Sequence, residues 1–285
     1  MFALFAALFL LFWSTGFVAA KFGLPYAEPL TFLGTRFVIA SVLMLLLCFV
    51  LRASWPRRLR EYGHIIIAGL LVQIGYLIGV YYGIYLGVSI GIMALIVGLQ
   101  PLVTSVLVGP LLGESVSPRQ RLGLVLGFGG LGLVVAEKVA FGEAVWLGYL
   151  LGLMALVAIT GGTLYQKKFC VGFDLRTTVA IQNIVSCVVI LALAGLFETM
   201  ETSWTGEYIF ALVWSAVCLS VIAIMAFYYL VARGAATKVT SLLYLSPPTT
   251  AVMGWLFFGE TLAAVAITGM VIAVVGVALV SAERR

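Results

Sequence analysis

Apolar residues fill ten successive stretches of the chain, and short polar or charged segments separate them. Each stretch is about 20 residues long, which is the length that an α-helix needs to cross the hydrocarbon core of a bilayer. The pattern therefore predicts ten membrane-spanning helices. Their expected ranges are 2–20, 30–51, 63–84, 89–110, 120–136, 145–165, 176–197, 208–230, 236–257 and 262–281.

The second half of the chain repeats residues of the first half at a fixed offset of 146 positions. The matching pairs are Pro101 and Pro247, Gly113 and Gly259, Glu114 and Glu260, and Gly123 and Gly269. Several Pro, Gly and Glu matches at one ungapped offset indicate an internal duplication. We predict two repeats of five helices each, with the boundaries 1–138 and 139–285.

The basic residues are distributed unevenly among the segments between the predicted helices. If the N-terminus is cytoplasmic, 13 of the 16 Lys and Arg residues fall in cytoplasmic segments, whereas only Lys21 and Lys138 lie outside. The remaining one, Arg36, lies within a span. Because cytoplasmic loops carry an excess of Lys and Arg, we predict that both termini are cytoplasmic.

An odd number of helices per repeat makes the two repeats enter the membrane from opposite faces. Glu114 then lies on the cytoplasmic side and Glu260 on the external side. Such inverted repeats are related by a pseudo-two-fold axis in the membrane plane, as in many secondary transporters. The predicted fold class is an all-α integral membrane protein with two five-helix inverted-topology repeats around a central cavity. Repeats that exchange conformations would produce alternating access.

Composition excludes several other classes of protein. The chain is 64% hydrophobic and 9% charged, whereas soluble proteins carry about 25% charged residues. The excess of basic residues lies in short loops, so it indicates membrane orientation rather than nucleic-acid binding. The four cysteines lack the paired spacing of metal sites. One histidine, and no Asp or Glu near the middle of a span, argue against an enzyme. We predict no catalytic residue, metal or cofactor.

Several motifs resemble those of one transporter family. They are Trp13-Ser14-Thr15-Gly16-Phe17 in the first helix, Pro29 and Arg36-Phe37 in the second, and the segments Pro101 to Glu114 and Pro247 to Glu260, each followed by a glycine-rich helix. On these motifs the chain resembles, over essentially its whole length, the ten-helix EamA-type members of the drug/metabolite transporter superfamily. The resemblance implies a bundle with a central cavity and export across the bacterial inner membrane. Size and layout are similar to those of YddG-like amino-acid exporters.

Two predicted spans contain prolines near their middle, Pro101 in one and Pro247 with Pro248 in the other. Proline removes a backbone donor and frees a carbonyl, which lipid cannot satisfy. We expect these kinks to act in gating and to face protein or a watery cavity. Gln100 and Ser246 precede the prolines at equivalent positions, and we predict that both bind substrate. The alternative is a packing kink in which Gln100 bonds to a neighbouring helix.

Aromatic and amide side chains within the spans are further candidates, because polar side chains in spans face the protein interior. Such a lining suits small amphipathic or zwitterionic solutes. The additional predicted substrate-binding residues are Trp13, Gln73, Tyr76, Tyr82, Gln182, Asn183, Tyr228 and Tyr244. Arg36 either binds a substrate carboxylate or bonds backbone carbonyls. We favour the structural role, since the resembling family has arginine here for differing substrates.

The predicted function is export of small metabolites, with amino acids first, by alternating access. The alternative is an exporter or facilitator of amphipathic drugs, sugars or nucleosides, followed by a channel and a membrane-embedded enzyme. Without an intramembrane carboxylate, a facilitator fits better than a proton-coupled pump. The predicted partners are a small-molecule substrate and the lipid bilayer, without nucleic acid, and the predicted assembly is a monomer.

Overall fold

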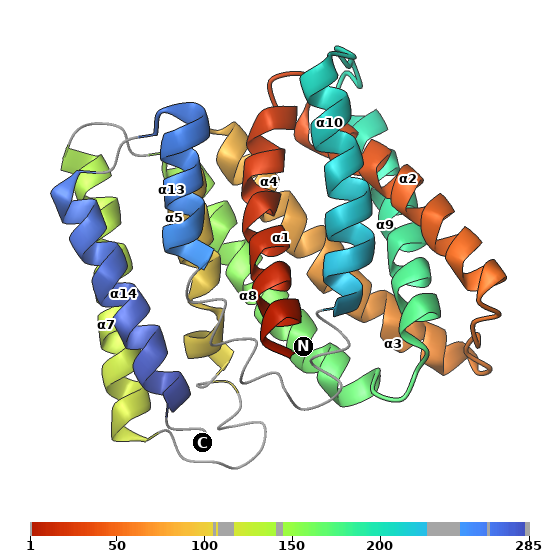
Figure 1. Ribbon diagram of the computed structural model, residues 1–285, viewed down its shortest axis with the longest axis horizontal. Helices are drawn as coiled ribbons and strands as arrows, with labels where there is room; N and C mark the ends of the chain where they lie inside the picture. The colour runs from red at the N-terminus through yellow and green to blue at the C-terminus, as the bar shows by residue number, and fades with distance from the viewer. Residues whose placement is uncertain are drawn as a thin grey trace.

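The computed structural model describes residues 2–104, 107, 117–140, 145–226, 246–260 and 263–282, which form an α-helical bundle (Figure 1). The first half contains α1 (Phe2–Gly23), α2 (Pro29–Val50), α3 (Leu59–Gly69), η1 (Leu70–Gly75), α4 (Tyr76–Tyr85), α5 (Ile90–Gly98) and α7 (Pro118–Ala140). The second half contains α8 (Trp146–Phe169), α9 (Leu175–Phe197), α10 (Gly206–Trp214), η2 (Ser215–Ala223), α13 (Ser246–Phe258) and α14 (Ala264–Ala282).

Five helical segments in these ranges are long and apolar enough to cross a membrane. They are Pro29–Val50, Leu59–Tyr85, Trp146–Phe169, Leu175–Phe197 and Gly206–Ala226. Shorter apolar helices accompany them, and the described residues contain a single isolated β-bridge, between Ala27 and Thr202, and no sheet. The all-α membrane class predicted from the apolar pattern is confirmed.

Polar caps and glycines set the helix ends where the sequence turns polar. Ser89, Asp174 and Thr205 precede α5, α9 and α10, and each side chain accepts a hydrogen bond from a backbone N–H of the first turn. Such caps satisfy donors that have no partner within the helix. Gly87, between α4 and α5, has φ +107°, a conformation that residues with a Cβ rarely adopt.

Two of the long helices change from α to π geometry part-way along. η1 separates α3 from α4, and η2 follows α10 directly. The 146-residue offset maps η1 onto 216–221, which lies inside η2. The apolar pattern predicts uninterrupted helices here, so this paired irregularity is a finding of the structure. π-Helical turns are rare and frequently mark functional sites.

Helices at equivalent positions of the two halves pack against each other. α2 packs on α9, α5 on α13 and α7 on α14, while α4 packs on α8 and α1 packs on α10 and η2. Glycines make some of these contacts very close, because a Cβ at Gly269 of α14 would lie 2.6 Å from the carbonyl oxygen of Gly130 in α7. The α7–α14 pair forms the left edge of the bundle in Figure 1.

The predicted kink residues lie near helix boundaries. α5 ends at Gly98 and helical structure resumes over 100–104, so a break precedes Pro101. Pro247 and Pro248 occupy the first turn of α13. The preceding residues lie outside the described ranges, so the position of these two prolines in the middle of a longer span stays a prediction.

Carboxylates mark the two ends of the bundle. The Glu198 end comprises 21–28, 86–90, 198–205 and 258–260, and there Ser203 N–H donates to the carbonyl of Tyr26 (2.9 Å). The Asp174 end comprises 51–58 and 166–176. α1 begins and α14 ends on the same side of the bundle as the Asp174 end (Figure 1).

Candidate functional site

A central cavity lies where α1, α2 and α4 meet the two π-helical segments. η1 contributes Val72 and Gln73 to its wall, and η2 contributes Leu219 and Ala223. The cavity volume is about 50 Å³, enough for a few water molecules, whereas ligand pockets span about 300–1,000 Å³. A metabolite can therefore enter this cavity only after the surrounding helices move apart.

One wall of the cavity is aromatic. Trp13 of α1 and Tyr76 of α4 stack with ring centroids 6.2 Å apart and an interplanar angle of 8°. Phe17 and Tyr81 also line the cavity, and Tyr81 packs against Phe32 with centroids 5.6 Å apart. Aromatic pairs of this kind contribute about 0.5–1.5 kcal/mol beyond the burial of their surface, so this wall is held firmly.

A chain of hydrogen bonds crosses the polar side of the cavity. Gln73 Nε2 donates to Asn183 Oδ1 (3.2 Å), and Asn183 Nδ2 donates to the carbonyl of Ser220 (3.4 Å). Arg36 Nε donates to Ser220 Oγ (2.8 Å) and Arg36 Nη1 to the hydroxyl of Tyr81 (3.0 Å). These bonds join η1, α9, η2, α2 and α4, so they fix both π-helical segments relative to the guanidinium.

Arg36 brings a permanent positive charge into this cavity. The residue is only 4% exposed and it lines the cavity wall. The two hydrogen-bond partners given above are neutral hydroxyls. Taking a cation out of water is costly unless an opposite charge and good hydrogen bonds compensate for it.

A second, smaller cavity adjoins the first, and Trp13 and Phe17 line both. Gln100, Pro101 and Ser246 contribute to the second cavity. Its volume of about 10 Å³ is at most enough for one water molecule. The break before Pro101 and the first turn of α13 therefore lie beside the central cavity, on the far side of Trp13.

The polar residues that precede the prolines are hydrogen-bonded to helices of the opposite half. Gln100 Nε2 donates to Thr163 Oγ1 of α8 (3.1 Å). Ser14 Oγ of α1 donates to Ser246 Oγ (3.1 Å). Gln100 therefore bonds to a neighbouring helix, as expected if the kink at Pro101 serves only packing. Gln100 also lines the second cavity. Both bonds join one predicted repeat to the first helix of the other.

Glu198 ties three helices together at its end of the bundle. Its carboxylate accepts hydrogen bonds from the backbone N–H groups of Leu30 (2.8 Å) and Thr31 (2.7 Å) in the first turn of α2, and from Thr31 Oγ1 (2.8 Å). The hydroxyl of Tyr82 in α4 donates to the same carboxylate (2.7 Å). A negative charge at a helix N-terminus is stabilised by the helix dipole.

A second carboxylate, that of Glu260, connects other helices at the same end of the bundle. Glu260, after α13, forms an ion pair with Lys21 in the last turn of α1. It also accepts a hydrogen bond from the N–H of Ile90 at the start of α5 (3.4 Å). The Glu260 side chain therefore connects the ends of α1, α5 and α13.

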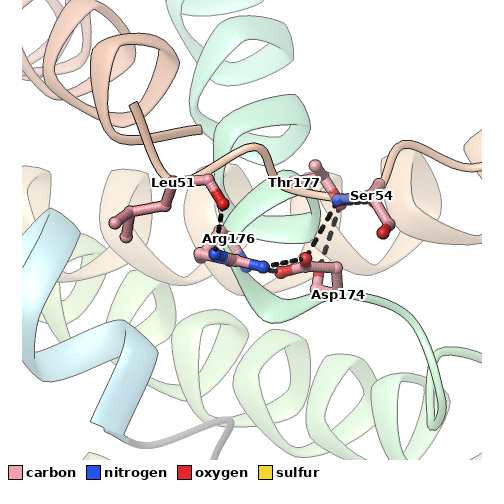
Figure 2. A network of polar contacts seen from close by, with 5 residues as sticks. All are labelled: Leu51, Ser54, Asp174, Arg176 and Thr177. Carbon is pink, nitrogen blue, oxygen red and sulfur yellow. Dashed lines mark hydrogen bonds and ion pairs between the residues drawn. The ribbon is translucent and has the colours of Figure 1, made fainter. Parts of the chain in front are cut away.

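A different network occupies the opposite end (Figure 2). Asp174 accepts hydrogen bonds from Arg176 Nε (2.9 Å) and from the backbone N–H of Ser54 (3.1 Å). Arg176 Nη1 donates to the carbonyl of Leu51 (3.1 Å), and Thr177 Oγ1 to that of Ser54 (3.0 Å). The hydrogen-bonded guanidinium holds the pKa of Asp174 below its usual value. This network fastens the segment after α2 to the start of α9.

The structure brings one part of the predicted site together. Trp13, Arg36, Gln73 and Tyr76 line the central cavity, and Gln100, Pro101 and Ser246 line the second. Asn183 and Gln182 are fully buried behind the cavity wall. Asn183 supports Gln73, whereas Gln182 donates to Gln166 (3.1 Å) and to the carbonyl of Ile65 (3.4 Å).

Other predicted residues lie elsewhere. Tyr82 lies at the Glu198 end rather than in the cavity wall. Pro247 is buried against α5, where a Cβ at Gly98 would be 2.9 Å from its Cγ. Pro248 lines a groove between α13 and α14. Tyr228 and Tyr244 fall outside the described residues.

Several residues of the site were not predicted from the sequence. Ser220 holds Arg36 and accepts from Asn183, Leu219 and Ala223 line the cavity, and Glu198 organises one end. The 146-residue offset maps Gln73 onto Leu219, and this is the sequence signal that could have indicated the η2 residues. No comparable signal distinguishes Glu198 from its neighbours in an acidic loop.

The site is equipped for binding. Its described side chains offer an aromatic wall, a guanidinium and hydrogen-bonding amides. Within the described residues no group of three or more His, Cys, Asp or Glu side chains is arranged to hold a metal ion. The four cysteines are free thiols, and two of them are buried.

Known proteins resemble this chain over most of its length. The "Uncharacterized transporter YvbV" of Bacillus subtilis (strain 168) is 28% identical over 284 residues, covering 99% of this chain and 92% of its own length. The "Uncharacterized transporter YoaV" of the same organism is 24% identical over 269 residues, covering 94% and 92%. A solved structure titled "Crystal structure of protein" matches with a TM-score of 0.72 at 19% identity, covering 99% of this chain and 98% of the other, and so has the same fold.

The model of the EamA-like transporter family matches the chain twice, over 1–136 and 146–282. Together these matches span nearly all of the sequence, in agreement with the resemblance of its motifs. The helical fold and the apolar spans agree with that assignment. This protein is a multi-pass membrane transporter, not an enzyme, and belongs to the EamA-like transporter family.

Proposed function

We propose that this transporter exports amino acids across the bacterial inner membrane by alternating access. In this proposal both termini are cytoplasmic and the Glu198 end is external. The observation that carries the proposal is the small central cavity, which is lined by the π-helical segments of both halves. A solute can occupy and leave such a cavity only if its two sides open in turn.

The ties at the Glu198 end support a state that is closed to the outside. The Lys21–Glu260 ion pair bridges α1 and α13, and Glu198, at the end of α9, bridges the start of α2 to Tyr82 of α4. Partly buried pairs of this kind are screened by salt much less than exposed ones. They favour the closed arrangement without making it permanent.

The sequence offset supplies a matching pair for the opposite side. Adding 146 to Lys21 gives Lys167, and subtracting 146 from Glu260 gives Glu114. Lys167 lies in the last turn of α8, as Lys21 lies in the last turn of α1. Lys167 is exposed and forms no ion pair with a described residue. We propose that Lys167 pairs with Glu114, which lies outside the described residues, when the cytoplasmic side closes.

The helix packing supports the same exchange. Equivalent helices pair with each other, and the contact of α4 with α8 has its counterpart in the contact of α1 with α10 and η2. A pseudo-two-fold axis requires this arrangement. Each half therefore has the surroundings it needs to adopt the conformation of the other.

The cavity chemistry favours amino acids over the alternative solutes. The guanidinium of Arg36 and the amide of Gln73 offer groups of opposite polarity beside the aromatic pair of Trp13 and Tyr76. A zwitterion with an apolar side chain matches this combination, whereas an amphipathic cation would meet the positive charge of Arg36. The small volume of the central cavity also argues against a channel, which needs a continuous pore.

Counterflow in proteoliposomes tests the proposal. The purified protein is reconstituted with unlabelled amino acids, sugars or nucleosides inside, and uptake of the radiolabelled solute is followed. We expect saturable counterflow of amino acids, and none in protein-free liposomes. Saturable counterflow of sugars or nucleosides alone would reject the amino-acid assignment, and an unsaturable, ion-like conductance would reject a transporter with alternating access.

A further inference from the structure

Among the described residues, Arg36 is a buried charge without a counterion. The guanidinium is buried, and its neighbours Ser220 and Tyr81 supply neutral oxygens at 2.8 and 3.0 Å. The ion pairs among the described residues, Lys21–Glu260 and Asp174–Arg176, lie at the ends of the bundle. No described carboxylate therefore compensates the charge of Arg36.

The guanidinium also has unused donor capacity. An arginine side chain carries five N–H donors, and the described residues accept from Nε and Nη1 only. Its Cζ lies 5.7 Å from the ring centroid of the adjacent Phe37, which offers π electrons but no hydrogen-bond acceptor. Arg36 lines the cavity, and two parallel N–H groups of a guanidinium match the two oxygens of a carboxylate.

A second group in the cavity complements this donor. Gln73 uses its Nε2 to donate to Asn183, and this bond orients the amide so that Oε1 is left as an acceptor without a partner among the described residues. Gln73 is 3% exposed and lines the same cavity. Its orientation is fixed through Asn183, which donates to the carbonyl of Ser220, and the hydroxyl of Ser220 accepts from Arg36.

We propose that Arg36 binds the carboxylate of the transported solute and that Gln73 Oε1 accepts a hydrogen bond from its ammonium group. This assignment rests on the amino-acid transport proposed above and specifies the recognising residues. The solute class is neutral amino acids. A second carboxylate would meet a single cation, and a cationic side chain would find no acidic partner among the described cavity residues.

The competing explanation is that Arg36 only holds α2, α4 and η2 together. The two hydroxyl bonds serve that purpose equally well with a neutral donor. These two hydrogen bonds therefore do not explain why the residue at position 36 is charged, although burial of a charge is unfavourable. A carboxylate bound in the cavity removes this imbalance, so the charge is explained by the loaded transporter rather than by the empty one.

Matched solute analogues test the assignment on the unmodified protein. Proteoliposomes are assayed for counterflow of radiolabelled leucine, phenylalanine and threonine. Competitors are the same amino acids, their carboxamides, and the corresponding acids without the amino group. Loss of one partner of a buried charge pair costs enough free energy that we expect each carboxamide to compete about 30-fold more weakly than its acid, or worse. The deaminated acids should retain most of the affinity that the carboxamides lose.

Variants then assign the preference to Arg36. Arg36→Gln keeps a hydrogen-bond donor but removes the charge, and it should bring the ratio of acid to carboxamide affinity close to one. Arg36→Lys should recover part of the preference. Arg176→Gln makes the same change at the Asp174 end and should leave the ratio unaltered. Tyr81→Phe removes one hydroxyl partner of the guanidinium and should preserve the preference for the acid even where stability falls.

The outcomes separate the assignment from the proposed function. Saturable amino-acid counterflow with equal competition by acids and carboxamides would overturn the role of Arg36 and leave the transport function standing. Counterflow of the deaminated acids, measured with their labelled forms, without counterflow of amino acids would support Arg36 as the carboxylate site and reject the amino-acid function. If Arg36→Gln does not fold, Arg36→Lys assigns the preference, and equal competition by acids and carboxamides on the unmodified protein would still overturn the role of Arg36.

Discussion

The two ends of the bundle are fastened in different ways. At the Glu198 end, Glu260 joins α1 to α5 and α13, and Glu198 joins α2 to α4. At the Asp174 end, the described network joins the segment after α2 to the beginning of α9 (Figure 2). α2 and α9 already pack along each other, so this second network reinforces an existing contact.

This difference concerns which helices the described ties connect. Ties between separate helix pairs at the Glu198 end oppose their separation, whereas the Asp174 network connects only α2 and α9. In the proposed alternating-access cycle, this structure is the state that is closed at the Glu198 end. The following predictions either remove the difference between the ends or measure it.

Glu198→Gln should have the largest effect on the closed end. The carboxylate accepts four hydrogen bonds, two of them from the first turn of α2. An amide replaces one acceptor oxygen by a donor and removes the charge, so we expect a loss of about 2 kcal/mol. Thermal unfolding of the purified protein measures it. Glu201→Gln, at an exposed position of the same loop, should change stability by less than about 0.5 kcal/mol.

The Lys21–Glu260 pair should contribute an intermediate amount. A double-mutant cycle with Lys21→Met and Glu260→Gln isolates the coupling of the two side chains. We expect about 1 kcal/mol, the upper part of the range for exposed pairs, because the Glu260 side chain is only 12% exposed. A coupling energy near zero even in low salt, where screening of the two charges is weakest, would show that this pair does not hold the end closed.

Lys167→Met should separate stability from transport. Lys167 has no ion-pair partner among the described residues, so its replacement should alter thermal stability by less than about 0.5 kcal/mol. Counterflow should nevertheless slow, because the opposite state loses its proposed pair with Glu114. Lys168→Met is the matched control and should slow counterflow much less. A loss of stability as large as that of Lys21→Met would contradict the assignment of the two lysines to different states.

The Asp174 network should have the smallest effect, and it should depend on pH. Arg176 lowers the pKa of Asp174 in the folded protein, so the ionised carboxylate stabilises the fold above its unfolded pKa of about 3.9. The contribution is lost as the pH falls below that value towards the folded pKa. The difference in thermal midpoint between the unmodified protein and Asp174→Asn should therefore shrink below about pH 4. A difference that stays constant down to pH 2.5 would exclude this origin.

The apolar pattern predicts the all-α membrane class and the five long apolar helices because a single physical requirement, the thickness of the hydrocarbon core, sets their length. It also identifies Trp13, Arg36, Gln73 and Tyr76, which line the central cavity, since polar and aromatic residues are conspicuous in apolar runs. It does not predict the π-helical segments. A π turn changes the direction of the side chains that follow it, so the 3.6-residue period no longer indicates which residues share a face.

The roles of individual polar residues depend on partners that are distant in sequence. Gln182 occupies the position equivalent to Arg36, yet it bonds to Gln166 and Ile65 behind the cavity while Arg36 faces the cavity. In the sequence, Glu198 is one acid among several in a loop. Its role depends on its hydrogen bond with Leu30 at the start of α2, which lies 168 positions away in the sequence. Tertiary contacts decide these cases, and local pattern does not encode them.

Disulfide trapping tests the two-state account most directly. In protein with its four native cysteines replaced by alanine, one variant carries Lys21→Cys with Glu260→Cys, a second carries Lys167→Cys with Glu114→Cys, and a third carries both pairs. We predict that either disulfide alone stops counterflow, that reduction restores it, and that the two disulfides do not form together in one molecule. Both disulfides in the same molecule, or undiminished counterflow with either one closed, would contradict alternating access between the Glu198 and Asp174 ends.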